Sequence, residues 1–349
     1  MKDLKYLVSY SIPFTCALGL YLREYWVFFT PFFAFALIPI LEIVLPVKNE
    51  NLSEEEIITK DSNVFFDVLL FLNLPLVYTL LAWFLWSISG ANYSTTELTG
   101  LILSLGIVLG SNGINVAHEL GHRRTQWEKT LGKLLLLPAF YMHFYIEHNF
   151  GHHQNAATAE DPASAIYNQT VYSFWVTSIV RQYLSAWKIQ LELLKRENIS
   201  FFNFKNDMMC YVVLQTLYLS LLFLIFDAKI MFTAVFVGLM AVVLLETINY
   251  IEHYGLSMIK TKNGRYERVS EIHYWNSNHV LGRVMLYELT RHSDHHHRAH
   301  KKYQLLNCHE TSPQMPFGYP TSMVLSLVPP LWFSIMNKRI PNEMKSQTS

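Results

Sequence analysis

Residues 98–124 read LTGLILSLGIVLGSNGINVAHELGHRR, and this stretch joins two unlike halves. Its first part, from Leu98 to Ala117, carries no charge and has the roughly 20 mainly apolar residues that an α-helix needs to cross a bilayer. Its end places His118 and His122 four residues apart, so both imidazoles lie on one face of a helix. The stretch therefore predicts a membrane-spanning helix that carries a pair of possible metal ligands at its end.

Other apolar segments extend this prediction along the chain. The stretch Leu134–Ile146 is uncharged but too short to cross a bilayer, so we expect a buried or interfacial helix there. The segment 6–22 is not typical of a secretory signal peptide, because no small-residue cleavage site follows it. The sequence predicts an all-α, polytopic membrane protein with six transmembrane helices, at residues 6–22, 25–46, 64–88, 97–117, 208–226 and 230–251.

The composition excludes several classes of protein. Charged residues make up 15% of the chain, against roughly 25% in an average soluble domain, and 51% of the residues are hydrophobic. The 27 basic residues balance the 27 acidic residues, which argues against a protein that binds nucleic acid by neutralising phosphates. The three cysteines, Cys16, Cys210 and Cys308, lie far apart and predict neither a disulfide framework nor a thiolate metal site.

The basic residues are distributed unevenly about the predicted spans. Only Arg23 and Lys229 lie on one side, and the other 25 lie on the side that the positive-inside rule assigns to the cytoplasm. Both ends of the chain are then expected in the cytoplasm. The predicted organisation is four transmembrane helices in 1–117, a cytoplasmic segment in 118–207, two transmembrane helices in 208–251 and a cytoplasmic C-terminal segment in 252–349.

All fifteen histidines fall at or after residue 118, in the two predicted cytoplasmic segments, where they predict a histidine-rich helical cap. Nine of them form four motifs with the spacing of metal ligands, and nine imidazoles are enough for two metal ions. Imidazole sites without thiolates suit iron, zinc, copper or nickel, so the ligands alone do not name the metal. The four motifs are His118-Glu-Leu-Gly-His122, His148-Asn-Phe-Gly-His152-His153, His253 with its flanks, and His292-Ser-Asp-His295-His296.

Two other functions fit parts of this pattern. His118-Glu119-x-x-His122 alone is typical of a zinc metalloprotease, but a zinc protease uses three protein ligands and leaves six motif histidines without a role. A metal transporter needs ligands near the middle of the bilayer, and the middle parts of the predicted spans contain no histidine.

The motifs resemble those of the integral-membrane alkane 1-monooxygenases, or alkane hydroxylases, of the fatty acid desaturase superfamily. The resemblance covers residues 97 to 335 approximately, and Thr290 departs from it where the family usually has Gln. The segment after the last box is also richer in histidine than usual, so His297 and His300 are further candidates around the metal site. The resemblance is carried by the four motifs in the forms HELGHR, EHNFGHH, NYIEHYGL (249–256) and RHSDHH (291–296), and by HYWNSNH (273–279) and the tail 316–332.

The resemblance implies a non-haem di-iron centre that uses O2 to hydroxylate the terminal carbon of n-alkanes to primary alcohols. Its implied iron ligands are His118, His122, His148, His152, His153, His253, His292, His295 and His296. Groups expected to hold the second nitrogens of these imidazoles are Asp161, Asn249, Glu252 and Asp294. The active site is expected at the cytoplasmic face of a bacterial inner membrane.

Electrons must then come from outside the chain, which has no flavin, haem or nicotinamide motif. The resemblance implies a rubredoxin-type donor fed by an NADH-dependent reductase, and the basic side chains nearest the motifs are candidates for binding it. Those candidates are Arg123, Arg124, Lys301 and Lys302. Related chemistry stays open: an aryl-methyl hydroxylase, a fatty acid desaturase or a decarboxylase of the same superfamily.

Overall fold

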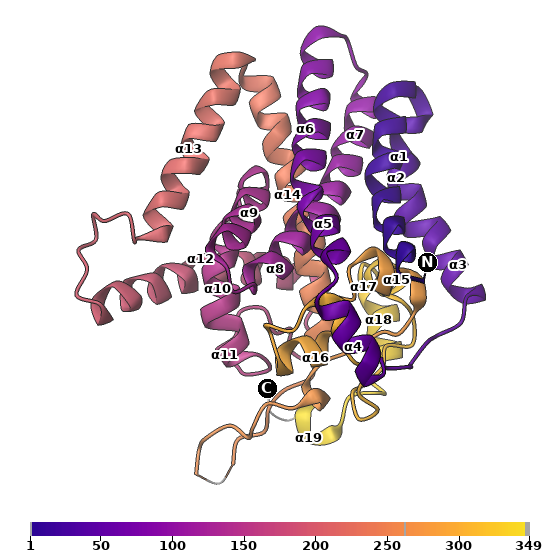
Figure 1. Ribbon diagram of the computed structural model, residues 1–349, viewed down its shortest axis with the longest axis vertical. Coiled ribbons are helices and arrows are strands. Elements are labelled where there is room, and N and C mark those ends of the chain that lie inside the picture. The colour runs from indigo at the N-terminus through magenta and orange to yellow at the C-terminus, as the bar shows by residue number, and fades with distance from the viewer. Residues whose placement is uncertain (1, 262, 346–349) are drawn as a thin grey trace. The chain divides into compact units, whose positions relative to one another are not determined.

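Long apolar helices dominate the part of the chain that the computed structural model describes, residues 2–261 and 263–345 (Figure 1). Five helical stretches there are long and apolar enough to cross a membrane, and they correspond to the last five of the six predicted spans. The all-α prediction is confirmed, because the described residues form no β-strand and only isolated bridges. The five candidate spans are Glu24–Val44, Val64–Gly90, Thr95–Gly121, Asp207–Ile225 and Ala228–His253.

The predicted count of six spans is not confirmed. Residues 6–22 are divided between a 3-10 helix, η1 (Lys2–Tyr10), and the 12-residue helix α1 (Ser11–Leu22). At 1.5 Å per residue, α1 alone is about 18 Å long, well short of the roughly 30 Å hydrocarbon core of a bilayer. Arg23 follows with a positive φ of 61°, which ends the helix before the next candidate span begins.

The chain divides into two compact units, each assembled from separate stretches. Unit 1 consists of residues 1–36, 64–147 and 183–245, and unit 2 of residues 37–63, 148–182 and 246–349. Two helices, α12 (Val171–Arg196) and α14 (Ala228–His253), have residues in both. The other helices of unit 1 are η1, α1, η2 (Glu24–Phe28), α2 (Phe29–Phe32), η3 (Phe33–Leu37, ending one residue beyond the unit), α5 (Val64–Phe71), α6 (Asn73–Gly90), α7 (Thr95–Val108), η4 (Leu109–Ile114), α8 (Asn115–Gly121), α9 (Gln126–Leu136), η5 (Leu137–Ala139), α10 (Phe144–Glu147) and α13 (Asp207–Ile225).

One continuous span in unit 1 leads to the first histidine motif. It begins at a capping box, in which Ser94 and Glu97 satisfy each other's backbone N–H groups, and runs through α7, η4 and α8. Its middle packs closely on α14, because a Cβ atom at Gly106 would lie 2.5 Å from Met240 and one at Gly110 would touch Ala241. These glycines therefore serve close helix packing, as small residues commonly do in membranes.

The short apolar stretch Leu134–Ile146 forms no long helix. It contains the end of α9, the 3-10 turn η5 with Pro138, a left-handed residue at Phe140 (φ 56°) and the start of α10. It is not among the candidate spans, in agreement with the expectation from its length.

Unit 2 is built from short helices joined by long connections. Its buried centre is aromatic: the ring of Trp332 lies against Tyr250 and Tyr254, and the indole N–H of Trp275 donates to the carbonyl of Tyr254. Besides its parts of α12 and α14, the unit contains α3 (Ile38–Val44), α4 (Glu54–Asp61), η6 (His148–His152), α11 (His153–Asn155), η7 (Glu271–His273), α15 (Val280–Met285), α16 (His292–His297), η8 (Tyr303–Leu305), α17 (Tyr319–Ser326), α18 (Pro329–Met336) and α19 (Asn342–Lys345).

Buried arginines hold the segment that precedes α16. Arg283 donates to the Glu288 carboxylate at 2.6 Å and to the Lys48 carbonyl, and Arg291 donates to the carbonyls of Leu306 and Glu50. Both arginines and Glu288 are buried, so each charge depends on these partners. The network fixes the backbone from which the three predicted ligands of α16 project.

Candidate metal centre

Three separate elements bring histidines together in unit 2: η6 with α11, the C-terminal end of α14, and α16. The first of these is a π-helix over His148–His152, whose wider turn pairs residues five apart rather than four. As a result His148 lies beside His153, with 3.1 Å between their Nε2 atoms, while His152 takes part in a different group.

His152, His253, His292 and His296 form what we call the second histidine group, whose ligand nitrogens lie within 4.8 Å of one another. The Nε2 atoms of His152 and His296 are 3.2 Å apart, and so are those of His253 and His292. Two imidazole nitrogens each about 2.1 Å from one metal ion, at right angles, stand roughly 3 Å apart. The spacing in this group therefore fits a shared metal ion.

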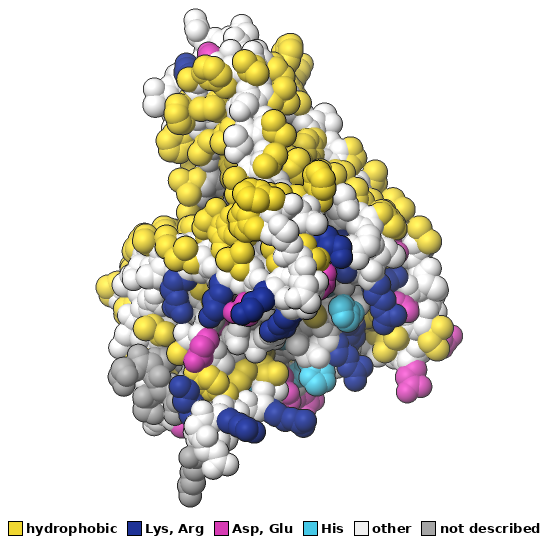
Figure 2. Space-filling model, turned by 90° about the vertical axis from the view of Figure 1, so that its left-hand side faces the viewer, with side chains coloured by type: hydrophobic (Ala, Val, Ile, Leu, Met, Phe, Trp, Pro, Cys, Tyr) yellow, Lys and Arg dark blue, Asp and Glu magenta, His cyan; other side chains and the backbone are white. Residues whose placement is uncertain are grey.

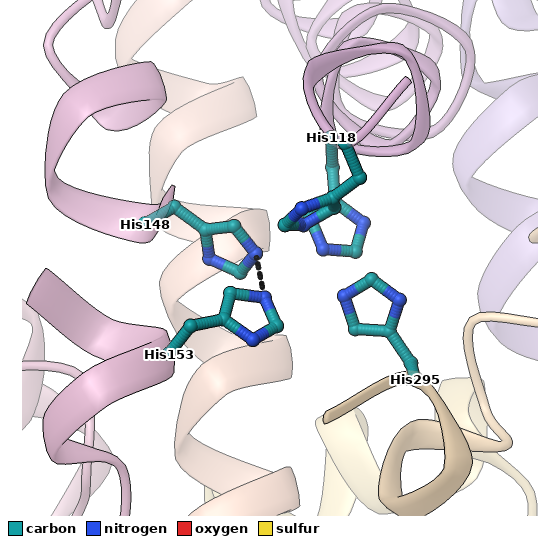
Figure 3. Close-up of side chains that lie close together, drawn as sticks. His118, His148, His153 and His295 are labelled. Carbon is teal, nitrogen blue, oxygen red and sulfur yellow. Dashed lines mark hydrogen bonds between the residues drawn. The ribbon is translucent and has the colours of Figure 1, made fainter. Parts of the chain in front are cut away.

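The first histidine group contains His148, His153 and His295 within unit 2. Figure 3 shows His148 and His153 facing each other and the ring of His295, from α16, pointing towards the same space. The ring centroids of His153 and His295 are 5.1 Å apart. Unit 2 alone thus gathers seven of the nine predicted ligands, in two distinct sets.

The remaining pair, His118 and His122, lies in unit 1 at the end of the span that carries η4. His118 is in the last turn of α8 and His122 directly follows it, and both are buried. Their rings are perpendicular, with centroids 5.0 Å apart. The predicted i,i+4 pairing on one helical face is therefore present.

Carboxylates lie beside the second nitrogens of two imidazoles in the second histidine group. Asp161 Oδ2 is 2.9 Å from His152 Nδ1, and Glu252 Oε1 is 3.5 Å from His292 Nδ1. A carboxylate at Nδ1 holds the proton there and leaves Nε2 free to bind metal. The Asp161 contact thus orients His152 as in known metal sites, and the longer Glu252 contact places a carboxyl group beside His292.

Comparison with known proteins agrees with this geometry. The family model "fatty acid desaturase" matches residues 94–321. Alkane 1-monooxygenase 2 of Pseudomonas aeruginosa is 37% identical over 88% of this chain and 82% of its own length. The chain belongs to the alkane 1-monooxygenase branch of the fatty acid desaturase family. Membership makes it an oxidoreductase.

Two further relatives are similar to the chain over almost its whole length. Alkane 1-monooxygenase 2 of Alcanivorax borkumensis is 34% identical over 97% of this chain and 91% of its own length. The xylene/toluene monooxygenase hydroxylase component of Pseudomonas putida is 28% identical over 97% of this chain and 89% of its own length. The similarity thus extends over the histidine motifs and the candidate spans alike.

The charge state of the site suits metal binding by a member of this family. Burial alone raises the pKa of Asp161, but the imidazoles of His152 and His253 and a hydrogen bond from Ser164 outweigh it and bring the pKa below its usual value. Burial and the surrounding imidazoles lower the pKa of His296 well below its usual value. Asp161 is therefore ionised and His296 neutral, and a neutral imidazole is the form that binds a metal.

The two other predicted partners of the ligands contact different groups. Asn249 donates its amide to Glu246 at 3.3 Å. Asp294 accepts hydrogen bonds from Lys301 at 2.6 Å and from the backbone N–H of Asn307, and its other oxygen is 2.8 Å from His309. These contacts outweigh its burial and lower the pKa of Asp294. Asp294, which lies between the predicted ligands His292 and His295, thus binds α16 to the segment that follows it.

Three of the four predicted donor-binding residues have partners inside the chain. Arg123 is buried and pairs with Asp67 at 3.0 Å and with Glu119 at 3.1 Å. Lys301 pairs with Asp294, and Lys302 donates to the Asp61 carbonyl at 2.7 Å. Arg124 is exposed.

Sequence reasoning assigned no role to two tyrosines next to the second histidine group. Tyr274 is buried and stacks on His296, with ring centroids 4.3 Å apart and 17° between the planes. Tyr319 is also buried, and its hydroxyl donates to Glu252 Oε1 at 2.8 Å. Both lie in segments that carry the family resemblance, 273–279 and 316–332. That resemblance was the sequence signal that could have identified them.

The remaining histidines lie outside both groups in the described part of the chain. His143 is buried between the rings of Tyr141 and Tyr183, with centroids 4.3 and 5.1 Å away. His273 Nε2 lies 3.2 Å from Glu267 Oε1, and His279 Nδ1 lies 2.9 Å from the Ser277 hydroxyl oxygen. The two extra candidates, His297 and His300, are at the periphery, and both are exposed.

Proposed function

We propose that the chain is a membrane-bound, non-haem di-iron monooxygenase that converts n-alkanes to primary alcohols by hydroxylating the terminal carbon. The single observation that carries this proposal is the division of seven imidazoles into two groups with the nitrogen spacing of metal ligands. Two groups favour two ions. A mononuclear hydrolase would need only one of them.

We assign seven of the nine motif histidines to the two ions as follows. His152, His253, His292 and His296 bind one ion, and His148, His153 and His295 bind the other. His118 and His122, the pair at the end of α8, are the two remaining ligands that the family resemblance implies for the di-iron centre. The ligand set has no thiolate, which suits iron.

Bound iron would supply the reduction of O2 and the attack on an inert C–H bond. The chain's own residues keep the site ready for that chemistry. Asp161 orients His152, Glu252 lies beside His292, and Tyr319 in turn holds Glu252. Tyr274 packs on His296 and, because burial raises the pKa of its phenol, remains neutral. The second group is largely buried, so water is mostly excluded from the place where the reaction occurs.

The reaction consumes one alkane, one O2, two protons and two electrons, and gives one alcohol and one water. The two electrons come from a rubredoxin-type donor that an NADH-dependent reductase recharges. Arg124 is the best placed of the four candidate residues to attract an acidic donor, because it is exposed. Lys301 and Lys302 have carboxylate or carbonyl partners already.

We further propose that the protein lies in a bacterial inner membrane with both ends and the metal centre on the cytoplasmic side. The uneven distribution of basic residues supports this orientation. An alkane offers no hydrogen bond, so it reaches the site from the bilayer in which it dissolves.

A second candidate substrate is a methyl group on an aromatic ring. The relative named as a xylene/toluene monooxygenase component favours it, although the identity of that relative is lower. The zinc protease alternative is disfavoured, because Glu119, which would be its general base, is engaged in an ion pair with Arg123.

The test is an NADH- and O2-dependent assay with a rubredoxin and its reductase, in which octane, hexadecane and toluene compete and the products are identified. We expect 1-octanol and 1-hexadecanol. Benzyl alcohol alone would favour the aryl-methyl hydroxylase, and an alkene without alcohol would favour a desaturase. His122→Ala and His253→Ala should abolish product formation while the protein still inserts into membranes.

A further inference from the structure

Helix α12 buries a mixed face against the protein, in which apolar side chains such as Phe174 and Leu194 alternate with polar ones. The side chains that point into the protein include Ser178, Gln182 and Gln190, all buried. Ser178 and Gln182 donate hydrogen bonds to the buried Glu246 of α14, at 2.7 and 2.9 Å. A water-facing helix normally buries its apolar face and exposes its polar one.

The exposed side of α12 carries a continuous apolar stripe with helical spacing. Val176 and Leu184 are 67% and 61% exposed, values unusual for aliphatic side chains in contact with water. The stripe consists of Tyr172, Val176, Val180, Tyr183, Leu184 and Leu191. From Tyr172 to Leu184 these residues recur every three or four positions, and Leu191 follows two turns after Leu184, so they lie on one face of the helix.

A charged stripe runs beside the apolar one on the same helix. It contains Arg181, Lys188, Lys195 and Arg196, with Glu192 as its acidic member, and all are exposed. The helix thus presents three faces: one towards the protein, one apolar and one charged. This arrangement is typical of a helix that lies in the plane of a membrane surface, with basic groups at the level of anionic headgroups.

The loop after α12 continues the apolar surface to the start of a candidate span. Phe202 and Phe204 are 85% and 92% exposed, and the ring of Phe201 stacks parallel to Trp187 of α12. The side chain of Gln190 holds this loop by donating to the Lys205 carbonyl. Asn206 then caps α13, which is long and apolar enough to cross a membrane.

The figures agree with this description. Figure 1 shows the C-terminal part of α12 running crosswise to α13. Figure 2 faces the side from which α12 and its loop project, and there hydrophobic side chains adjoin a group of Lys and Arg side chains.

We infer that α12 and the loop 201–204 form an in-plane anchor in the lipid bilayer. The apolar stripe and the phenylalanines lie at the boundary between headgroups and acyl chains, and the charged stripe contacts anionic phospholipid headgroups. The occupant is the bilayer itself, because the surface is continuous with a candidate span. The segment 118–207, expected in the cytoplasm as a whole, is then partly at the membrane surface.

The anchor also links the bilayer surface to the metal-binding helix. The buried face of α12 holds Glu246, which lies two turns before His253 on α14. The lipid-facing helix thus helps to position the end of α14.

The experiment uses adjacent positions that face different stripes. In bilayer nanodiscs containing anionic lipid, a nitroxide spin label is attached in turn to Val176→Cys, Thr177→Cys, Val180→Cys and Arg181→Cys, with Cys16, Cys210 and Cys308 replaced by serine. We expect O2 to relax the labels at 176 and 180 more than a water-soluble nickel chelate does, and the reverse at 177 and 181.

Three results would overturn the inference. Equal access of the nickel chelate to both stripes would place the helix in water, and equal protection of both stripes would embed it fully. Immobilised labels at 176 and 180 that neither reagent reaches would indicate a second protein chain as the occupant.

A second measurement needs no substitution. A lipid-soluble diazirine activated by light should modify the unaltered protein at Val176, Val180, Leu184 and Phe202 and leave the side chains of Lys188 and Glu192 unmodified. No modification in residues 172–204, together with normal labelling of α13, would contradict the anchor.

Discussion

Asp161 and His152 form a buried pair, with 2.9 Å between the carboxylate Oδ2 and the imidazole Nδ1. Asp161 also accepts hydrogen bonds from the Ser164 hydroxyl and the Ala163 backbone N–H, so its carboxylate is fixed on three sides. The pair therefore sets both the rotation and the tautomer of an imidazole in the second histidine group.

The substitution Asp161→Asn should weaken metal binding without unfolding the protein, because asparagine can still accept hydrogen bonds but carries no charge. Removing such a partner typically lowers metal affinity about 10–100-fold. The measurement is metal retained against a graded chelator. Glu160→Gln is the matched control, because Glu160 is exposed and contacts Tyr266 instead. Unchanged retention in Asp161→Asn would remove this residue from the site.

The Glu42 carboxylate lies so close to the backbone at position 318 that only glycine fits there. A Cβ atom at position 318 would collide with that carboxylate, which is buried and accepts a hydrogen bond from the Gly282 N–H at 3.0 Å. Gly318→Ala should therefore displace Glu42 and destabilise the protein by about 1–3 kcal/mol, the cost of leaving a buried polar group unsatisfied.

Thermal unfolding in nanodiscs measures this effect. Gly90→Ala is the control, because nothing lies within 4 Å of a Cβ atom there. In a double-mutant cycle, Glu42→Ala should remove most of the cost of Gly318→Ala. A full cost in the absence of the Glu42 carboxylate would show that another contact requires the glycine.

Arg123 and Arg124 are adjacent but should respond differently to substitution. Arg123→Ala removes a buried ion pair with Glu119 and should destabilise the protein by about 3 kcal/mol. Arg124→Ala should leave the unfolding temperature unchanged and raise the KM for the rubredoxin donor, an effect that fades at high salt. A KM for the donor that Arg124→Ala does not change, measured at low salt, would exclude Arg124 from donor binding.

Burial lowers the pKa of His143 to about 3. The unfolded chain, with a usual histidine pKa near 6.5, takes up a proton first as the pH falls. His143 therefore costs no stability above pH 6.5, and destabilises the folded protein progressively as the pH falls from 6.5 towards 3, by about 2 kcal/mol at pH 5.

The variant His143→Gln should make the unfolding temperature less sensitive to pH across this window. His300→Gln, at an exposed position, is the control. The same pH sensitivity in wild type and His143→Gln would contradict the assigned effect of burial.

The parts of the fold that follow from local sequence could be predicted, and the rest depends on backbone geometry or distant contacts. Apolar runs such as 208–226 located five candidate spans, because length and hydropathy alone determine whether a helix can cross a bilayer. Residues 6–22 have the same composition, yet the chain there begins as a 3-10 helix, which composition does not reveal.

In the metal centre, too, local sequence predicted some features and distant contacts determined the others. Spacing identified the histidines, but an α-helical reading pairs His148 with His152, whereas the π-helix η6 places His148 beside His153. Tyr319 reaches Glu252 from 67 residues away, and no local pattern reports such a contact. The sequence suggested that Arg123 could bind an electron donor. Its ion pair with Asp67, which is distant in the sequence, could not be predicted from local pattern.

Metal analysis of the purified protein and of two variants shows whether two separate histidine groups bind two iron ions. We expect two irons per chain in the unaltered protein and about one in His253→Ala and in His148→Ala, because each substitution removes a ligand from only one group. One zinc per chain without iron, or loss of all metal in both variants alike, would contradict this expectation.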